Sequence, residues 1–125
     1  MFEEKKQIVP HQHSTEAHNL TELKRELDNQ ENFDVVSNVF KQLDDSTRLK
    51  IFWLLCHCEM CVINIAAMMN MSGPAVSHHL SRLKNTGLIT SRRSGKEVYY
   101  KAARTPEAQL LHLTIENIMD ITCPD

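Results

Sequence analysis

The chain has 125 residues, of which 42% are hydrophobic and 24% charged, and this suits one globular domain with a real hydrophobic core. No apolar run reaches the roughly 18 residues of a membrane helix, and the first residues lack the basic-then-apolar pattern of a signal peptide. We therefore expect a cytoplasmic protein with no membrane partner, in a compartment where thiols stay reduced. Its four cysteines then indicate metal binding, redox chemistry or burial rather than disulfides.

The net charge of −2 is unevenly distributed along the chain. Residues 77–104 carry seven Lys and Arg side chains against one acid, Glu97, so this segment is +6 and the remainder is −8. A basic segment in an otherwise acidic protein suits a phosphate backbone, because each Lys or Arg contact releases condensed counterions. A solvated surface without a partner explains the charge alone equally well.

In chain order, residues 1–19 show no clear periodicity and are predicted to form a flexible arm carrying three histidines, His11, His13 and His18. Leucines at spacings of three and four predict a helix over about residues 15–27, and a similar stripe predicts a second helix over residues 33–43. Ser46 is expected to cap the next helix. That helix is apolar almost all round, which predicts a buried central helix.

Residues 61–71 predict a short helix, and a second helix should begin near Pro74 and end at Gly87. Alternating residues then predict a β-hairpin over residues 88–102 with a basic tip. This order is typical of a winged helix-turn-helix, a mainly α fold with a small β-hairpin wing (α+β). The last helix and the N-terminal leucines offer more apolar surface than one small domain covers, which predicts a homodimer on palindromic double-stranded DNA.

Two stretches, DDSTRLKIFWLL and PAVSHHLSRLKNTGLITSRRSGKEVYYKA, resemble the ArsR/SmtB family of bacterial metal-sensing repressors, and the resemblance covers roughly residues 33–122. It implies a dimeric repressor that leaves its operator DNA when an inducer, usually a metal ion, binds. Residues 20–125 would form the DNA-binding and dimerisation domain. The implied DNA contacts come from the second helix of the motif and from the wing: Ser72, Ser77, His78, His79, Arg82, Arg92, Arg93 and Lys96.

The family's two common inducer sites are incomplete in this chain. Three of the four positions that correspond to its last-helix site cannot serve as ligands; the four are Arg104, Pro106, Asn117 and Asp120. In the family's other site, Cys61 matches the first cysteine, but Ile63 and Asn64 replace the second cysteine and the acid. His112 and Glu116 lie four residues apart, a spacing that can hold a metal. They are off the family's ligand positions, and we interpret them as interface or supporting polar groups.

The stretch LLCHCEMCV supplies a different set of thiols. Cys58 and Cys61 have the C-x-x-C spacing that lets two thiolates meet one ion, and Cys56 lies just upstream. The predicted metal ligands are therefore Cys56, Cys58, Cys61 and Cys123, with His11, His13 and His18 as weaker candidates. His57 is expected to point away from the thiols. Thiolate with imidazole favours Zn²⁺, Cd²⁺ or Pb²⁺, with Cu⁺ and As(III) as further options. For each cysteine alone, burial as a small apolar residue is the alternative.

The predicted function is a metal-responsive transcriptional repressor. The alternative is a thiol redox or persulfide-sensing repressor on the same scaffold. No glycine-rich phosphate loop, paired carboxylates or nucleophile elbow is present, which argues against an enzyme or an organic cofactor.

Overall fold

The computed structural model describes residues 19–120, and the chain divides after Val36 into two compact units. The first unit contains α1 (Leu20–Leu27) and the start of α2 (Gln30–Gln42). The three leucines of the predicted stripe, Leu20, Leu23 and Leu27, are all on α1 and all exposed. The predicted boundary of the arm, after residue 19, stays a prediction.

The second unit is built around α3 (Ser46–His57), the predicted central helix. Ile51 and Phe52 on α3 are 0% exposed, which confirms its burial. The expectation that Ser46 caps this helix was wrong. Asp45 has the extended backbone of a cap, and its Oδ1 accepts a hydrogen bond of 3.0 Å from the backbone N–H of Arg48.

The helix-turn-helix consists of α4 (Val62–Met69) and α5 (Gly73–Asn85). Asn70 ends α4 in the left-handed conformation, at φ 56°, and the Ser72 hydroxyl caps α5 by accepting from the N–H of Ala75 at 3.2 Å. One face of α5 is buried against the core, at Val76, Leu80 and Leu83. Gly87 follows the end of α5 at φ 78°, which glycine adopts without a Cβ clash.

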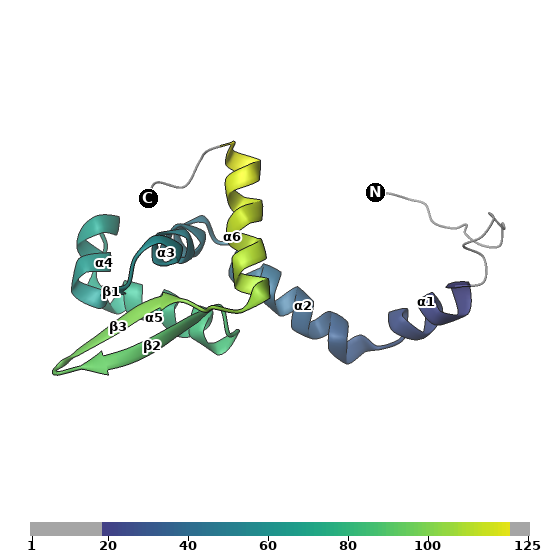
Figure 1. The fold of residues 1–125 in the computed structure, drawn as a ribbon. Coiled ribbons are helices and arrows are strands. Elements are labelled where there is room, and N and C mark those ends of the chain that lie inside the picture. Colours follow the sequence, from purple (N-terminus) through teal and green to yellow (C-terminus); the bar gives the residue numbers. More distant parts are fainter. Residues whose placement is uncertain (1–18, 121–125) are drawn as a thin grey trace. The chain divides into compact units, whose positions relative to one another are not determined.

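The wing has one more strand than expected. The predicted hairpin is present as β2 (Ile89–Ser94) and β3 (Glu97–Ala102), and Figure 1 shows it extending away from the helices of this unit. The two-residue strand β1 (Met60–Cys61) pairs with the other edge of β3, which gives an antiparallel sheet in the order β1-β3-β2. The segment between α3 and α4 is thereby hydrogen-bonded to the wing.

The last helix is α6 (Pro106–Met119), and the hydroxyl of Thr105 caps it by accepting from the N–H of Ala108. This helix packs against α3 (Figure 1). Its inner face buries Ala108 and Glu116. Four large apolar side chains of α6 are exposed: Leu110, Leu113, Ile118 and Met119. Among residues 19–120, no helix is long and apolar enough to cross a bilayer.

Candidate nucleic-acid interface and metal sites

The outer face of α5 presents short polar and basic groups to solvent. Ser77, His78 and Arg82 are exposed, and the Nε of Arg82 donates to the Nε2 of His78 at 3.3 Å. Ser72 is exposed at the start of α5, with its hydroxyl engaged as the helix cap. A helix that buries one face and presents such groups on the other can place hydrogen-bonding side chains against base edges and phosphates.

His79 is placed differently from the other predicted contact residues of α5. It is half-buried, and its Nδ1 lies 3.1 Å from Nη1 of Arg48. Arg48 is itself buried, and its Nε donates to the backbone carbonyl of Gln42 at 2.6 Å. Burial lowers the pKa of His79 below its ordinary value of 6.5, with the nearby Arg48 charge acting in the same direction. Through these contacts, His79 connects α5 to the buried Arg48 of α3.

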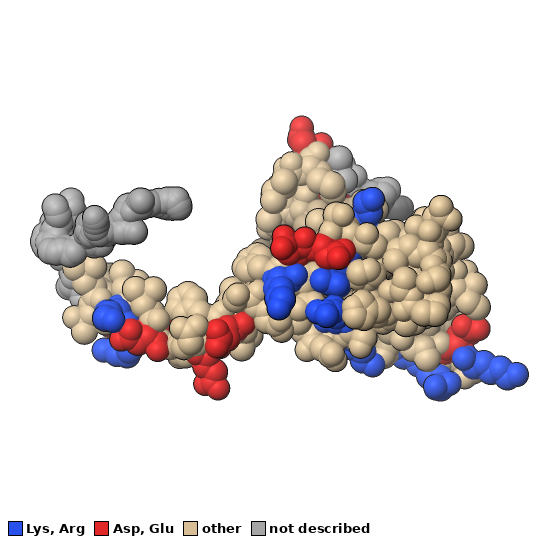
Figure 2. Space-filling model, turned by 180° about the vertical axis from the view of Figure 1, so that it is seen from behind, with Lys and Arg blue, Asp and Glu red and all other residues tan. Residues whose placement is uncertain are grey.

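The wing carries three exposed cations, and Figure 2 shows basic side chains gathered towards its end, at the lower right of that view. Arg92 forms a two-pronged ion pair with Glu59, with both nitrogen–oxygen distances at 2.8 Å. This hydrogen bonding lowers the pKa of Glu59 and raises that of Arg92. Arg93 and Lys96 are exposed beyond this pair. The wing is thus tied through Arg92 to the segment that holds the cysteines.

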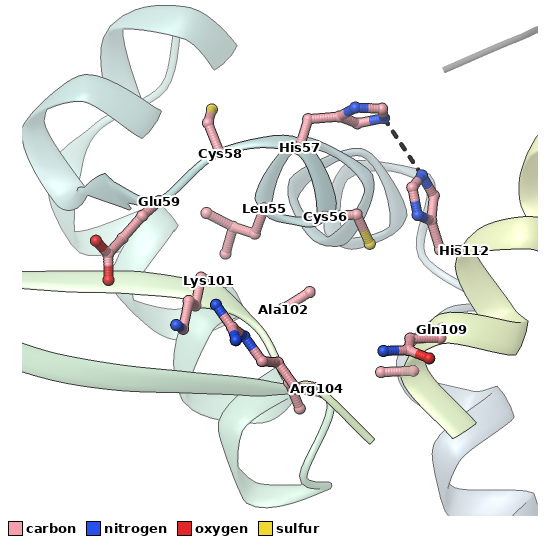
Figure 3. Close-up of a pocket in the computed structure, with 12 residues that line it drawn as sticks. Leu55, Cys56, His57, Cys58, Glu59, Lys101, Ala102, Arg104, Gln109 and His112 are labelled. Atoms are coloured by element: carbon pink, nitrogen blue, oxygen red, sulfur yellow. Dashed lines mark hydrogen bonds between the residues drawn. The ribbon is translucent and has the colours of Figure 1, made fainter. Parts of the chain in front are cut away.

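The three cysteines near the end of α3 face different surroundings. Cys56 is half-buried and packs against the core, whereas Cys58 is exposed, with its Sγ 3.9 Å from the carbonyl oxygen of Leu54. In Figure 3 the sulfur atoms of Cys56 and Cys58 point to different sides of the chain. Cys61 is buried at the start of α4. Within residues 19–120, these three thiols do not form one group of neighbouring potential ligand atoms.

The other predicted ligands, Cys123, His11, His13 and His18, lie outside the described residues.

A cavity of about 290 Å³ lies beside the cysteine segment. Cys56, His57 and Cys58 line one side of it, and Lys101 and Arg104 line another (Figure 3). The cavity is therefore both thiol-bearing and basic.

A group of potential metal ligands that was not predicted from the sequence lies between α3 and α6. It consists of His57, His112 and Glu116, whose potential ligand atoms lie within 4.8 Å of one another. His57 thus turns towards α6, where Figure 3 shows its ring meeting that of His112. The four-residue spacing of His112 and Glu116 was the one sequence signal for this group.

Comparison with known proteins identifies the scaffold. The family described as "Bacterial regulatory protein, arsR family" matches residues 45–91, which contain α3, the helix-turn-helix and the start of β2. The transcriptional repressor SdpR of Bacillus subtilis is 41% identical over 70 residues, which cover 56% of this chain and 78% of that protein. The chain belongs to the arsR family. This is a family of regulatory proteins and not of enzymes.

The chain is also similar to other transcriptional regulators. The cadmium resistance transcriptional regulatory protein CadC of Listeria innocua is 47% identical over 72 residues, or 55% of this chain. The chain spans 60% of the length of that relative. A homodimeric winged helix-turn-helix DNA-binding domain from Mycobacterium bovis superimposes with a TM-score of 0.67 at 32% identity, covering 73% of this chain and 83% of that domain. The predicted fold is thus confirmed.

Proposed function

We propose that this arsR-family protein is a transcriptional repressor that binds double-stranded operator DNA as a homodimer and is released by a thiophilic metal ion. The observation that carries the proposal is the exposed polar face of α5 beside a basic wing, on the scaffold of a regulatory family. Such a protein would act in the cytoplasm, where its thiols remain reduced.

In this proposal α5 enters the major groove. Ser77, His78 and Arg82 contact base edges or phosphates, and Ser72 lies at the helix terminus closest to the backbone. His79 contributes through Arg48, which fixes the orientation of α5. On the wing, Arg93 and Lys96 contact phosphates directly, and Arg92 does so when it leaves Glu59.

The exposed apolar face of α6 is the proposed dimer surface. Ile118 is 79% exposed and Leu110 63%, and large apolar side chains left this exposed favour association with a partner. The Mycobacterium bovis domain is described as homodimeric, which supports the same arrangement here. A two-fold symmetric dimer would read a palindrome, with its two α5 helices about 34–36 Å apart.

The proposed inducer site uses the cysteine segment, with Cys58 and Cys61 at its centre. Cys56 and Cys123, and less strongly His11, His13 and His18, are the remaining ligand candidates. These thiolates and imidazoles fit Zn²⁺, Cd²⁺ or Pb²⁺, with Cu⁺ and As(III) as further options, and the relative CadC is described as a cadmium resistance regulator. The bound ion would hold the thiolates of Cys58 and Cys61 in fixed positions relative to each other.

The link from this site to DNA binding is local. Cys61 belongs to β1, which pairs with β3 of the wing, and Glu59 holds Arg92 of β2. A change in the backbone between Cys58 and Cys61 therefore acts on the wing and on the start of α4 together. An inducer must stabilise the DNA-free conformation more than the DNA-bound one, and a metal ion at this segment would do so by changing the position of the wing and of α4.

The proposal is tested by selecting duplexes from a random pool with the reduced protein and measuring their affinity by fluorescence anisotropy. We expect a palindromic site, and a loss of about 1–3 kcal/mol in binding for Arg82→Ala if Arg82 reads a base. A protein that selects no sequence, or that binds with Arg82→Ala as tightly as without it, would contradict the assignment of α5. Release by an oxidant or persulfide in place of an ion would make the cysteines a redox switch.

A further inference from the structure

Three ligand-type side chains meet where the end of α3 packs against α6. The Nε2 atoms of His57 and His112 are 3.3 Å apart, and each lies 3.3 Å from Oε2 of Glu116. The two histidine side chains are 15% and 22% exposed, and that of Glu116 is 6% exposed. The three atoms form an equilateral triangle with a buried carboxylate at one corner and solvent access at the other two.

This triangle has the dimensions of one face of a tetrahedral metal site. An ion that holds ligands tetrahedrally at about 2.0–2.1 Å keeps them about 3.3–3.4 Å apart. Octahedral coordination at about 2.0–2.1 Å, as Mg²⁺ demands, would bring neighbouring ligands to about 2.8–3.0 Å. The observed separation therefore suits a tetrahedral ion without any displacement of the three side chains.

The hydrogen bonds within the group converge on one carboxylate oxygen. Oε2 of Glu116 already accepts a hydrogen bond of 2.8 Å from the indole N–H of Trp53. The histidine contacts at 3.3 Å are longer than the common N–H···O distance of about 2.9–3.0 Å. The two Nε2 atoms also face each other, an arrangement in which only one of them can donate. A cation would use a lone pair from all three atoms at once.

We propose that His57, His112 and Glu116 bind a tetrahedral divalent ion, which we assign as Zn²⁺ because it accepts imidazole nitrogen and carboxylate oxygen in four-coordinate sites, with the fourth position open to water. Two imidazoles and a carboxylate are a common zinc ligand set when a position is left open. Trp53 orients the carboxylate through its indole N–H, as groups behind metal ligands commonly do. The site takes no ligand from the cysteine cluster.

The position of this site gives the ion a structural consequence. His57 is the last residue of α3 and directly precedes the cysteine segment, while His112 and Glu116 lie on α6, whose outer face is the proposed dimer surface. An ion bound here would join α3 to α6 within one protomer and stabilise their packing. The proposal concerns binding to one chain, so it holds or fails independently of DNA binding.

The test uses Trp53, the chain's only tryptophan, whose indole contacts both Glu116 and the ring of His57. The reduced, metal-free protein is titrated with Co²⁺ while tryptophan fluorescence and the visible d–d bands are recorded, and Zn²⁺ is then added as a competitor. We expect the quenching to follow the binding of one Co²⁺ per protomer, separately from any Co²⁺ that the cysteine segment binds, and to be reversed by Zn²⁺. His112→Gln and Glu116→Gln should each weaken binding by at least about tenfold.

Glu107→Gln, which removes an exposed carboxylate from the same helix, is the matched control and should bind Co²⁺ as the unaltered protein does. Cys58→Ser should leave the quenching unchanged. Quenching that survives both ligand substitutions, or that disappears with Cys58→Ser, would overturn the proposal. If Glu116→Gln does not fold, proton NMR of the unaltered protein decides. Zn²⁺ must then shift the imidazole resonances of His57 and His112, and their failure to move would overturn the site.

Discussion

The wing makes a quantitative prediction about the salt dependence of DNA binding. Arg93 and Lys96 are exposed beyond the Glu59–Arg92 pair, so each is available to contact one phosphate. In a dimer, Arg93→Ala combined with Lys96→Ala removes four phosphate contacts. The plot of log K against log salt has a negative slope, and this loss should make it shallower by about 3.6. Between about 50 and 200 mM salt, four such contacts account for about a 150-fold change in affinity.

The assay is fluorescence anisotropy on the selected operator at several salt concentrations. Arg104→Ala is the control, because it removes one positive charge per protomer from the cavity wall and none from the tip of the wing. The control should leave the slope nearly unchanged. If the double variant retains the slope of the unaltered protein, or if Arg104→Ala lowers it equally, the wing does not contact phosphates and the reasoning is refuted.

Glu59→Gln should have the opposite effect. It removes the partner that holds Arg92 and so makes a further cation available, which should steepen the slope by up to about 1.8 per dimer. A shallower slope or a weaker complex would show that the ion pair positions Arg92 for DNA.

Three other predictions concern folding and assembly. Asp45→Ala should lower the free energy of unfolding by about 1 kcal/mol in urea melts, because α3 loses its cap; an unchanged midpoint would contradict the capping role. Burial lowers the pKa of His79, so the unfolded chain binds its proton more readily and stability should fall as the pH drops through 6.5. The free energy of unfolding should therefore differ less between about pH 7.5 and 5.5 in His79→Gln than in the unaltered protein. An equal difference in both proteins would show that His79 is not the source of the pH dependence. Ile118→Glu should shift sedimentation towards the monomer, whereas Ile63→Glu, at an exposed site on α4, should not; equal behaviour of the two variants would exclude the α6 face as the interface.

The elements with strong local signals could be predicted from the sequence. The proline start of α5, the glycine that follows it and the two strands of the wing all lie where their patterns place them. In each case neighbouring residues carry the information, through helical spacing, alternation or turn chemistry. The cap of α3 was misassigned by one residue, because Asp45 and Ser46 are both good capping residues and only the backbone conformation separates them.

Features made by distant segments could not be predicted in this way. β1 is two residues long and exists because β3 offers it an edge, so it has no alternating pattern of its own. The contact of His57 with Glu116 spans 59 residues, and which side of α3 His57 faces depends on where α6 packs. The pair of Arg92 with Glu59 likewise joins residues 33 positions apart. Each requires tertiary packing that local periodicity does not specify.

The most direct test of the central claim is the affinity of the reduced protein for its selected operator, measured by anisotropy during titration with Zn²⁺, Cd²⁺ and Pb²⁺. Thiolate-to-metal charge-transfer absorption is recorded in the same samples. We expect one of these ions to weaken the complex at near-stoichiometric amounts while the absorption grows in step, and Cys61→Ser to abolish both effects. DNA affinity that is unchanged by every ion, or that falls equally in Cys61→Ser, would contradict a metal-responsive repressor with its inducer site at Cys61.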